Sequence, residues 1–180
     1  LMRNSIEVIN LSKSYNTKQA VNNINFKIKE NEIIGLLGPN GCGKTTTIGM
    51  ILGLLKPSNG EIFINGMNSE KNRTKILQKI NFISPYVELP KKITVKQNLI
   101  VYGKLYCVKD LNNRIEYLAN KLRLEDFLNR VTGELSSGQK NRASLAKALI
   151  NEPNVLLLDE PTASLDPEIG DFVRTFLENY

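Results

Sequence analysis

The chain has 180 residues, 41% of them hydrophobic, which suits one α/β domain with or without a small insertion. Its apolar runs fall short of the roughly 18 residues of a membrane span, and we expect no signal peptide. The formal net charge is +6, but lysine and arginine are dispersed, so no nucleic-acid partner is expected. The two cysteines, Cys42 and Cys107, predict no structural disulfide, which fits a reducing compartment.

Alternating apolar residues predict antiparallel strands at the start of the chain. The alternation is visible over residues 6–11 and is strict over residues 24–28. Residues 61–64 predict a further short strand, and the pair Asn65-Gly66 is typical of the turn that follows one. We therefore expect a half-buried antiparallel sheet in this part of the chain.

Residues 38–45, GPNGCGKT, match the phosphate-binding loop pattern G-x-x-x-x-G-K-[ST]. The glycines allow successive N–H groups to turn toward phosphate oxygens. Lys44 is placed for the β- and γ-phosphates, and the Thr45 hydroxyl for Mg²⁺. Residues 33–37 predict a buried strand entering the loop, and residues 45–55 predict a helix whose positive N-terminus faces the nucleotide. The expected nucleotide contacts are Gly38, Pro39, Asn40, Gly41, Cys42, Gly43, Lys44, Thr45 and Thr46.

The middle of the chain changes from strand patterns to helix patterns. Residues 80–83 predict a core strand. Thr94 and Gln97 have the spacing of a capping box at the start of a helix, and Asp110 is placed to cap a second helix. We therefore expect a helical insertion over about residues 88–133.

The last third predicts one more helix and one more strand. Ser136 is placed to cap a helix whose apolar face continues over residues 143–150. The uninterrupted apolar run 155–158 predicts a central parallel strand covered on both faces. Asp159 and Glu160 then fall at the carboxyl end of that strand, where α/β sheets bind ligands.

Taken together, these motifs resemble the nucleotide-binding domain of an ATP-binding cassette (ABC) transporter. The resemblance covers essentially the whole chain, and its specific element is the signature motif, because phosphate loops occur in many families. The motifs that agree in order and spacing are the loop 38–45, the signature Leu135–Gln139, the strand end 158–161 and the loop 164–166. The implied fold is α/β, a phosphate-loop NTPase (RecA-like) core with an N-terminal antiparallel β subdomain and an inserted helical subdomain. Residues 1–180 would form one such domain.

The resemblance also implies roles for single residues, with ATP and Mg²⁺ as cofactors. Tyr15 would stack on adenine, Asp159 would hold Mg²⁺ through water, and Glu160 would polarise the attacking water, with Lys44 as the second catalytic residue. Two domains would pair about a two-fold axis, so that the signature of one faces the nucleotide on the other. The signature residues that would make this contact are Ser136, Ser137, Gly138 and Gln139.

The function implied is that of an ATP-hydrolysing transporter subunit, cytoplasmic and peripheral on the inner face of the cell membrane. Its partners would be a second ABC domain, in a homodimer or heterodimer, and separate membrane-spanning subunits. The family docks the membrane partner around residues 86–106, where Tyr86, Tyr102 and Tyr106 are candidate contacts; for the last two, core packing is the alternative. Two other functions stay open: a truncated, non-catalytic nucleotide-binding remnant, and a non-transport ABC ATPase. The membrane subunits choose the substrate, so this chain specifies neither substrate nor direction.

The sequence departs from the family pattern in three places. The signature reads LSSGQ, with Ser137 where glycine is more usual. Pro85 stands where the family usually has a glutamine that touches Mg²⁺ and the attacking water. The chain contains no histidine, and the family's next strand and its histidine would follow Tyr180. We therefore expect a C-terminally truncated domain that lacks the last strand and the histidine loop.

Overall fold

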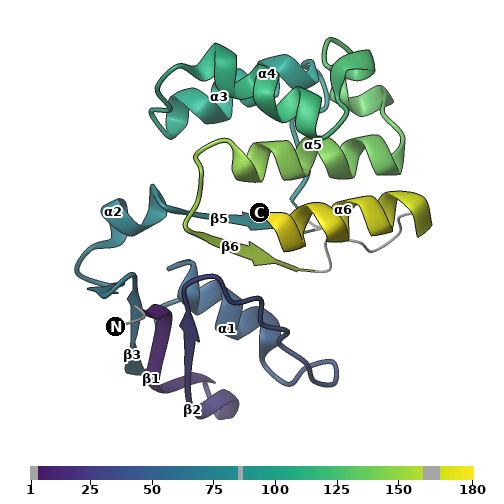
Figure 1. The fold of residues 1–180 in the computed structure, drawn as a ribbon. Coiled ribbons are helices and arrows are strands. Elements are labelled where there is room, and N and C mark those ends of the chain that lie inside the picture. The colour runs from purple at the N-terminus through teal and green to yellow at the C-terminus, as the bar shows by residue number, and fades with distance from the viewer. Residues whose placement is uncertain (1–3, 85–86, 160–166) are drawn as a thin grey trace. The chain divides into compact units, whose positions relative to one another are not determined.

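The structure, a computed structural model, describes residues 4–84, 87–159 and 167–180. Its contacts divide the chain into two compact units, Leu1–Ile80 and Asn81–Tyr180 (Figure 1). The first unit is built on an antiparallel sheet, and the second is mainly helical around a pair of strands. Among the helices that the structure describes, none combines the length and the apolar character needed to cross a bilayer.

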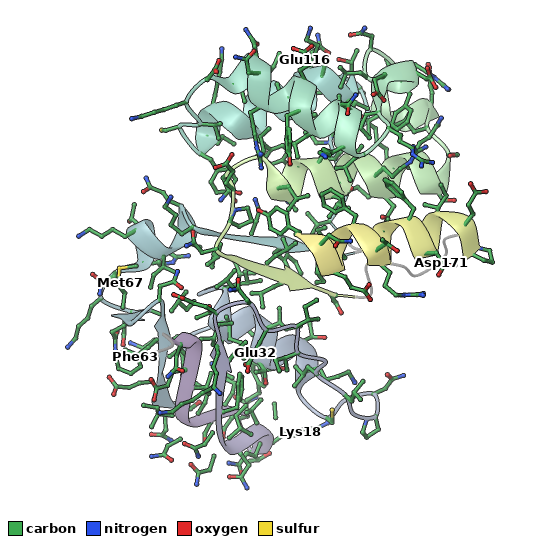
Figure 2. All side chains as sticks on the ribbon, viewed as in Figure 1. Lys18, Glu32, Phe63, Met67, Glu116 and Asp171 are labelled. Carbon is green, nitrogen blue, oxygen red and sulfur yellow. The ribbon has the colours of Figure 1, made fainter. Side chains whose placement is uncertain are left out.

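The sheet of the first unit has the strand order β2-β1-β3-β4. Its strands are β1 (Asn4–Tyr15), β2 (Lys18–Lys29), β3 (Asn59–Ile64) and β4 (Met67–Asn68). The predicted strands are confirmed, because Ile6 in β1 lies opposite Ile28 in β2 on one side and Ile64 in β3 on the other. Asn65 and Gly66 have φ of 49° and 75°, as the predicted turn requires. This hairpin lies next to Phe63 and Met67, which are labelled in Figure 2.

The predicted buried strand over residues 33–37 is wrong. This segment is irregular, and Ile33 and Leu37 are 73% and 91% exposed. A strand forms only where its N–H and C=O groups pair with a neighbouring backbone. The segment joins neither edge of the β2-β1-β3-β4 sheet. Without a paired neighbour it forms no strand, although its residues are apolar.

Helix α1 (Lys44–Ile51) is shorter than the predicted range of 45–55. Leu52 caps its C-terminus, and the following Gly53 has a φ of 67° and donates its N–H to the Met50 carbonyl. The N–H of Leu54 donates to the Gly49 carbonyl at 2.9 Å, which completes a Schellman ending. The remaining helix of this unit is the short α2 (Arg73–Leu77).

The second unit packs its helices around one apolar core (Figure 1). They are α3 (Val95–Leu105), α4 (Leu111–Lys121), α5 (Ser137–Leu149) and α6 (Pro167–Asn179), with 3₁₀ turns η1 (Glu125–Phe127) and η2 (Thr132–Glu134). Leu99, Leu118 and Leu145 are at most 1% exposed, whereas Glu116, labelled in Figure 2, lies on the exposed face of α4.

Two helix starts were predicted for the region between the core strands, and one of the two caps is confirmed. The Thr94 hydroxyl accepts the Gln97 N–H at 3.1 Å, and the Gln97 side chain accepts the Thr94 N–H at 2.9 Å. Asp110 precedes α4 but makes no capping bond, and its carboxylate instead accepts from the Asn113 amide at 2.7 Å. The reason is its left-handed conformation, because a capping residue needs extended dihedrals to face the first helical N–H groups.

Strands β5 (Ile80–Ile83) and β6 (Val155–Leu158) lie side by side and point the same way in Figure 1. Both were predicted, but β6 is not central: within the described residues its sheet contains only β5 and β6. Val155 is buried, while residues 156–158 are half-buried. The apolar run therefore identified the strand correctly but not the number of its neighbours.

Candidate nucleotide-binding site

Residues 38–45 turn tightly into α1, and Gly43 is the residue on which that turn depends. Its φ is 96°, a left-handed conformation at the N-cap of the helix. A Cβ at this position would lie 2.4 Å from the carbonyl oxygen of Ala20 in β2. Because L-residues avoid this φ and the space is occupied by backbone, only glycine fits. The contact also seats the loop against the sheet of the first unit.

The loop leaves the N-terminus of α1 open to a ligand. The Thr47 N–H donates to the Gly43 carbonyl at 2.8 Å, so the helical hydrogen bonds begin there. Among the described residues no side chain caps the helix at Gly43. The preceding N–H groups, those of Lys44, Thr45 and Thr46, therefore lie at the positive end of the helix dipole without an intrahelical acceptor. Such an end is suited to phosphate.

The Lys44 ammonium lies across the loop that it follows. Its Nζ donates to the carbonyls of Gly38 at 2.6 Å and Pro39 at 2.9 Å, and lies 3.8 Å from the Cys42 sulfur. These acceptors are neutral, so a phosphate oxygen would offer the same cation a stronger, charge-assisted bond. Thr45 is exposed. The loop thus presents a cation and an exposed hydroxyl beside the N–H groups at the helix start.

Tyr15 belongs to the same unit as the loop. It is the last residue of β1 and lies opposite Lys18, the first residue of β2. Two positions after Lys18, the Ala20 carbonyl lies against Gly43 of the loop. Lys18 is labelled in Figure 2. The Tyr15 ring is 46% exposed, and the Lys13 ammonium lies 5.2 Å from its centroid. The β1–β2 hairpin therefore connects the predicted adenine-stacking residue to the phosphate loop through one strand.

The signature residues lie at the start of α5. The Ser136 hydroxyl accepts the Gln139 N–H at 3.2 Å, and the Gln139 amide oxygen accepts the Ser136 N–H at 3.0 Å. This confirms Ser136 as the predicted cap and adds Gln139 as the second half of a capping box. Ser136 and Ser137 are exposed, while Leu135 is buried beneath them. The start of α5 therefore lies at the surface, and the buried Leu135 anchors it to the core.

Asp159 follows β6 and is tied to the end of β5. Its N–H donates to the Ile83 carbonyl at 2.9 Å, and its Oδ2 accepts the Ser84 hydroxyl at 3.4 Å. Ser84 was not singled out in the sequence, because a serine after a strand carries no distinctive pattern. Pro85, Tyr86, Glu160, Pro161 and residues 164–166, which the sequence analysis singled out, lie outside the described residues.

The predicted site residues fall into two sets. Tyr15 and residues 38–46 lie in the first unit, where the Gly43–Ala20 contact connects them. Residues 136–139 and Asp159 lie in the second unit. A tight glycine loop before a helix N-terminus without a side-chain cap is the arrangement found in phosphate-loop proteins. The signature sequence at the start of α5 separates this chain from other phosphate-loop proteins.

Comparison with known proteins identifies the family. The profile described as "ABC transporter" matches residues 21–163. The chain belongs to the ABC transporter family, as the motifs implied. Its fold class is confirmed by the structure of an ATP binding subunit of an ABC transporter, at a TM-score of 0.88 and 27% identity, covering 97% of this chain and 73% of that one. A dimeric post-hydrolysis state of the ATP-binding cassette MJ0796 with ADP and Pi gives a TM-score of 0.85 at 29% identity, covering 96% of this chain and 81% of that one.

Curated relatives agree with this family. Nod factor export ATP-binding protein I of Rhizobium johnstonii is 41% identical over 165 residues, which are 91% of this chain and 53% of that protein. Bacitracin transport ATP-binding protein BcrA of Bacillus licheniformis is 38% identical over 169 residues, which are 92% of this chain and 54% of that protein. The chain therefore spans about half the length of these relatives.

Proposed function

We propose that the chain binds ATP with Mg²⁺ and hydrolyses it to drive transport through separate membrane-spanning subunits. The observation that carries this proposal is the seating of Gly43 against Ala20, which holds the phosphate loop at the open N-terminus of α1. Together with family membership over residues 21–163, this geometry favours an ATP-using subunit.

ATP binding would use groups that the loop already presents. The Lys44 ammonium would exchange the Gly38 and Pro39 carbonyls for the β- and γ-phosphates. The open amides of residues 44–46 would donate to phosphate oxygens. Tyr15 would stack on the adenine, since its ring is half exposed at the end of β1.

The residues proposed for Mg²⁺ have the required chemistry. The Thr45 hydroxyl and the Asp159 carboxylate are oxygen ligands, which Mg²⁺ prefers. The Ser84 hydroxyl, 3.4 Å from Asp159 Oδ2, orients that carboxylate. Bound Mg²⁺ would neutralise charge on the phosphates, and Glu160, which follows Asp159 in the sequence, is proposed to polarise the attacking water.

A second copy or a related ABC domain would complete the site. The capping box occupies the side chains of Ser136 and Gln139, while Ser137 is exposed at the helix start. Backbone N–H groups at this end would meet the γ-phosphate of the nucleotide on the other copy. The dimeric form reported for the MJ0796 cassette supports such pairing.

The membrane partner is proposed to dock beside a hollow in the second unit. The hollow is shallow, and its lining includes Ser84, Val87, Tyr102, Ser144 and Lys147. Tyr102 and Tyr106 also pack against the helical core. Docking there would place the chain on the cytoplasmic face of the cell membrane, and relatives named for Nod factor export favour outward transport.

An ATPase assay of the full chain tests the proposal. We expect Mg²⁺-dependent release of phosphate that Lys44→Ala and Glu160→Gln abolish, with ATP binding retained in Glu160→Gln. Equal phosphate release by all three proteins would contradict the assignment of the site. Co-purification with a membrane protein, lost when that protein's gene is deleted, tests the transport role.

A further inference from the structure

Asn98, on the first turns of α3, is completely buried and polar. Its Nδ2 donates to the Thr132 hydroxyl at 2.9 Å, the Thr94 carbonyl at 3.1 Å and the Pro90 carbonyl at 3.2 Å. The Thr132 hydroxyl in turn donates to the Ile93 carbonyl at 3.1 Å. Two side chains, Asn98 and Thr132, thus collect three carbonyls from one stretch of chain.

Backbone hydrogen bonds join the same two segments. The Val95 N–H donates to Arg130, and the Lys96 N–H to Leu128, at 3.1 Å and 2.8 Å. In the opposite direction the Thr132 N–H donates to the Ile93 carbonyl at 3.0 Å. Gly133 lies so close to Lys91 that a Cβ there would be 3.0 Å from the Lys91 carbonyl oxygen. Residues 90–96 and 128–133 therefore form one clamp, with Asn98 and Thr132 at its buried centre.

The clamp stands directly before the signature motif. Thr132 opens η2 (Thr132–Glu134), whose next residue is the buried Leu135, and Ser136 then caps α5. The Leu135 N–H donates to the Thr132 carbonyl at 3.4 Å. Three residues separate Thr132 from Ser136, so a single 3₁₀ turn connects the clamp to the start of α5.

The side-chain oxygen of Asn98 indicates that this residue positions its neighbours rather than adding stability. Its Oδ1 is buried and, among the described residues, has no hydrogen-bond partner. A buried acceptor without a partner is destabilising, and an apolar side chain would avoid that cost. Asn98 supplies what an apolar side chain could not, a directional contact to Thr132.

We propose that Asn98 and Thr132 are positioning residues that hold the start of α5, and so Ser136 and Ser137, in the orientation that engages nucleotide on a second copy. The part about the second copy rests on the proposed function; the clamp itself does not. Neither residue touches the nucleotide in this proposal.

Two substitutions at one position test it. Thr132→Val keeps the shape of the side chain but removes both hydroxyl bonds, and Thr132→Ser keeps them. Gln139 and Lys140 donate their N–H groups to Ser136, so their hydrogen exchange reports on the start of α5. In the full chain this exchange should be about tenfold faster in Thr132→Val and near wild type in Thr132→Ser, tenfold corresponding to about 1.4 kcal/mol. Equal exchange in the two variants overturns the clamp.

Association tests the functional half. In a Glu160→Gln background, light scattering with Mg²⁺ and ATP should show dimers about tenfold weaker for Thr132→Val than for Thr132→Ser. Titration with a fluorescent ATP analogue, at a protein concentration too low for dimers, should show unchanged affinity, because the phosphate loop lies in the other unit.

A matched control separates positioning from general stability. Arg114→Met weakens the opposite end of α5, where Arg114 Nη2 donates to the Leu149 carbonyl. If Arg114→Met lowers the melting temperature as much as Thr132→Val yet keeps ATP-dependent association, the positioning role stands. Equal loss of association overturns it. If the Glu160→Gln chain with Thr132 intact forms no dimer in the presence of ATP, the proposed dimer is wrong. Hydrogen exchange alone then decides whether the clamp holds the start of α5.

Discussion

Arg114 of α4 and Arg142 of α5 each donate to carbonyls at the end of the other's helix. Arg114 Nη2 lies 2.6 Å from the Leu149 oxygen, and Arg142 Nη1 lies 2.8 Å from the Arg123 oxygen. Each guanidinium also covers an aromatic ring, Tyr117 or Phe127, at about 5 Å. A cation at a helix C-terminus meets free carbonyls and the negative end of the dipole. The two arginines therefore fix α4 and α5 against each other.

The first prediction is that Arg114→Met destabilises the chain by about 1.5–3 kcal/mol, because a charge-assisted bond to a helix end is lost while the apolar stem is kept. Urea unfolding measures this. Arg174→Met is the control, since the partner of Arg174 among the described residues is the exposed Asp171 at 2.8 Å, and removal of such a pair should cost about 0–1 kcal/mol. Equal losses would mean that the interhelix bond contributes nothing special.

Lys44→Ala should weaken ATP binding by about 1.5–3 kcal/mol, or roughly ten- to hundredfold, because it removes a charge-assisted contact to phosphate. Titration with a fluorescent ATP analogue measures the change. Lys18→Ala, which removes an exposed lysine from the same unit, is the control and should bind normally. Unchanged affinity in Lys44→Ala would count against the phosphate-loop assignment.

Gly43→Ala should abolish ATP binding and destabilise the first unit. The new methyl group would combine an unfavourable φ of 96° with an approach of 2.4 Å to the Ala20 oxygen. Gly41→Ala is the matched control: its φ is also positive, at 81°, but a Cβ there meets nothing within 4 Å. It should cost only the backbone strain of about 1–3 kcal/mol. Similar thermal unfolding of the two variants would show that the Ala20 contact is unimportant.

A maleimide adduct on Cys42 should block ATP binding, because this exposed thiol lies in the loop whose amides are proposed to bind phosphate. ATP should in turn protect Cys42 from labelling, as peptide mass spectrometry would show. Cys107 is also exposed but lies outside the loop, so a Cys42→Ser chain labelled at Cys107 should still bind ATP. Full binding by chain labelled at Cys42 would exclude the predicted steric block.

Lys147 should make stability depend on alkaline pH. Burial lowers the pKa of its ammonium below the ordinary value of 10.5, although the Phe82 carbonyl accepts from it at 3.3 Å. The unfolded chain then binds more protons than the folded one between the lowered pKa and 10.5, so the Lys147 contribution to stability rises with pH across that window.

Comparison with Lys147→Met isolates this contribution. Burial raises the pKa of Tyr106 and Tyr180, which lowers stability at high pH in both proteins and cancels in the difference. Urea unfolding at several pH values from neutral to 10.5 should show the wild type gaining on the variant as pH rises. A constant difference would mean that the Lys147 pKa is not lowered.

The sequence by itself determined the local parts of the site. The capping boxes at Thr94 and Ser136 form as predicted, because their partners lie three residues away and depend on little else. The turn of the phosphate loop into α1 was likewise predictable, since glycine at position 43 can adopt the positive φ that the turn requires. Family membership followed from the same motifs.

Only the tertiary structure decided what depends on residues distant in the chain. The apolar run 33–37 resembles a strand, but pairing needs a neighbouring backbone that its own composition does not supply. In the sequence Asn98 resembles any polar helix residue. Only the fold shows that it is buried and bonded to Thr132, 34 positions away. The signature helix is recognisable from five letters, but what holds its start in place is a clamp between segments that the sequence keeps apart, because burial and hydrogen-bond partners are properties of the fold.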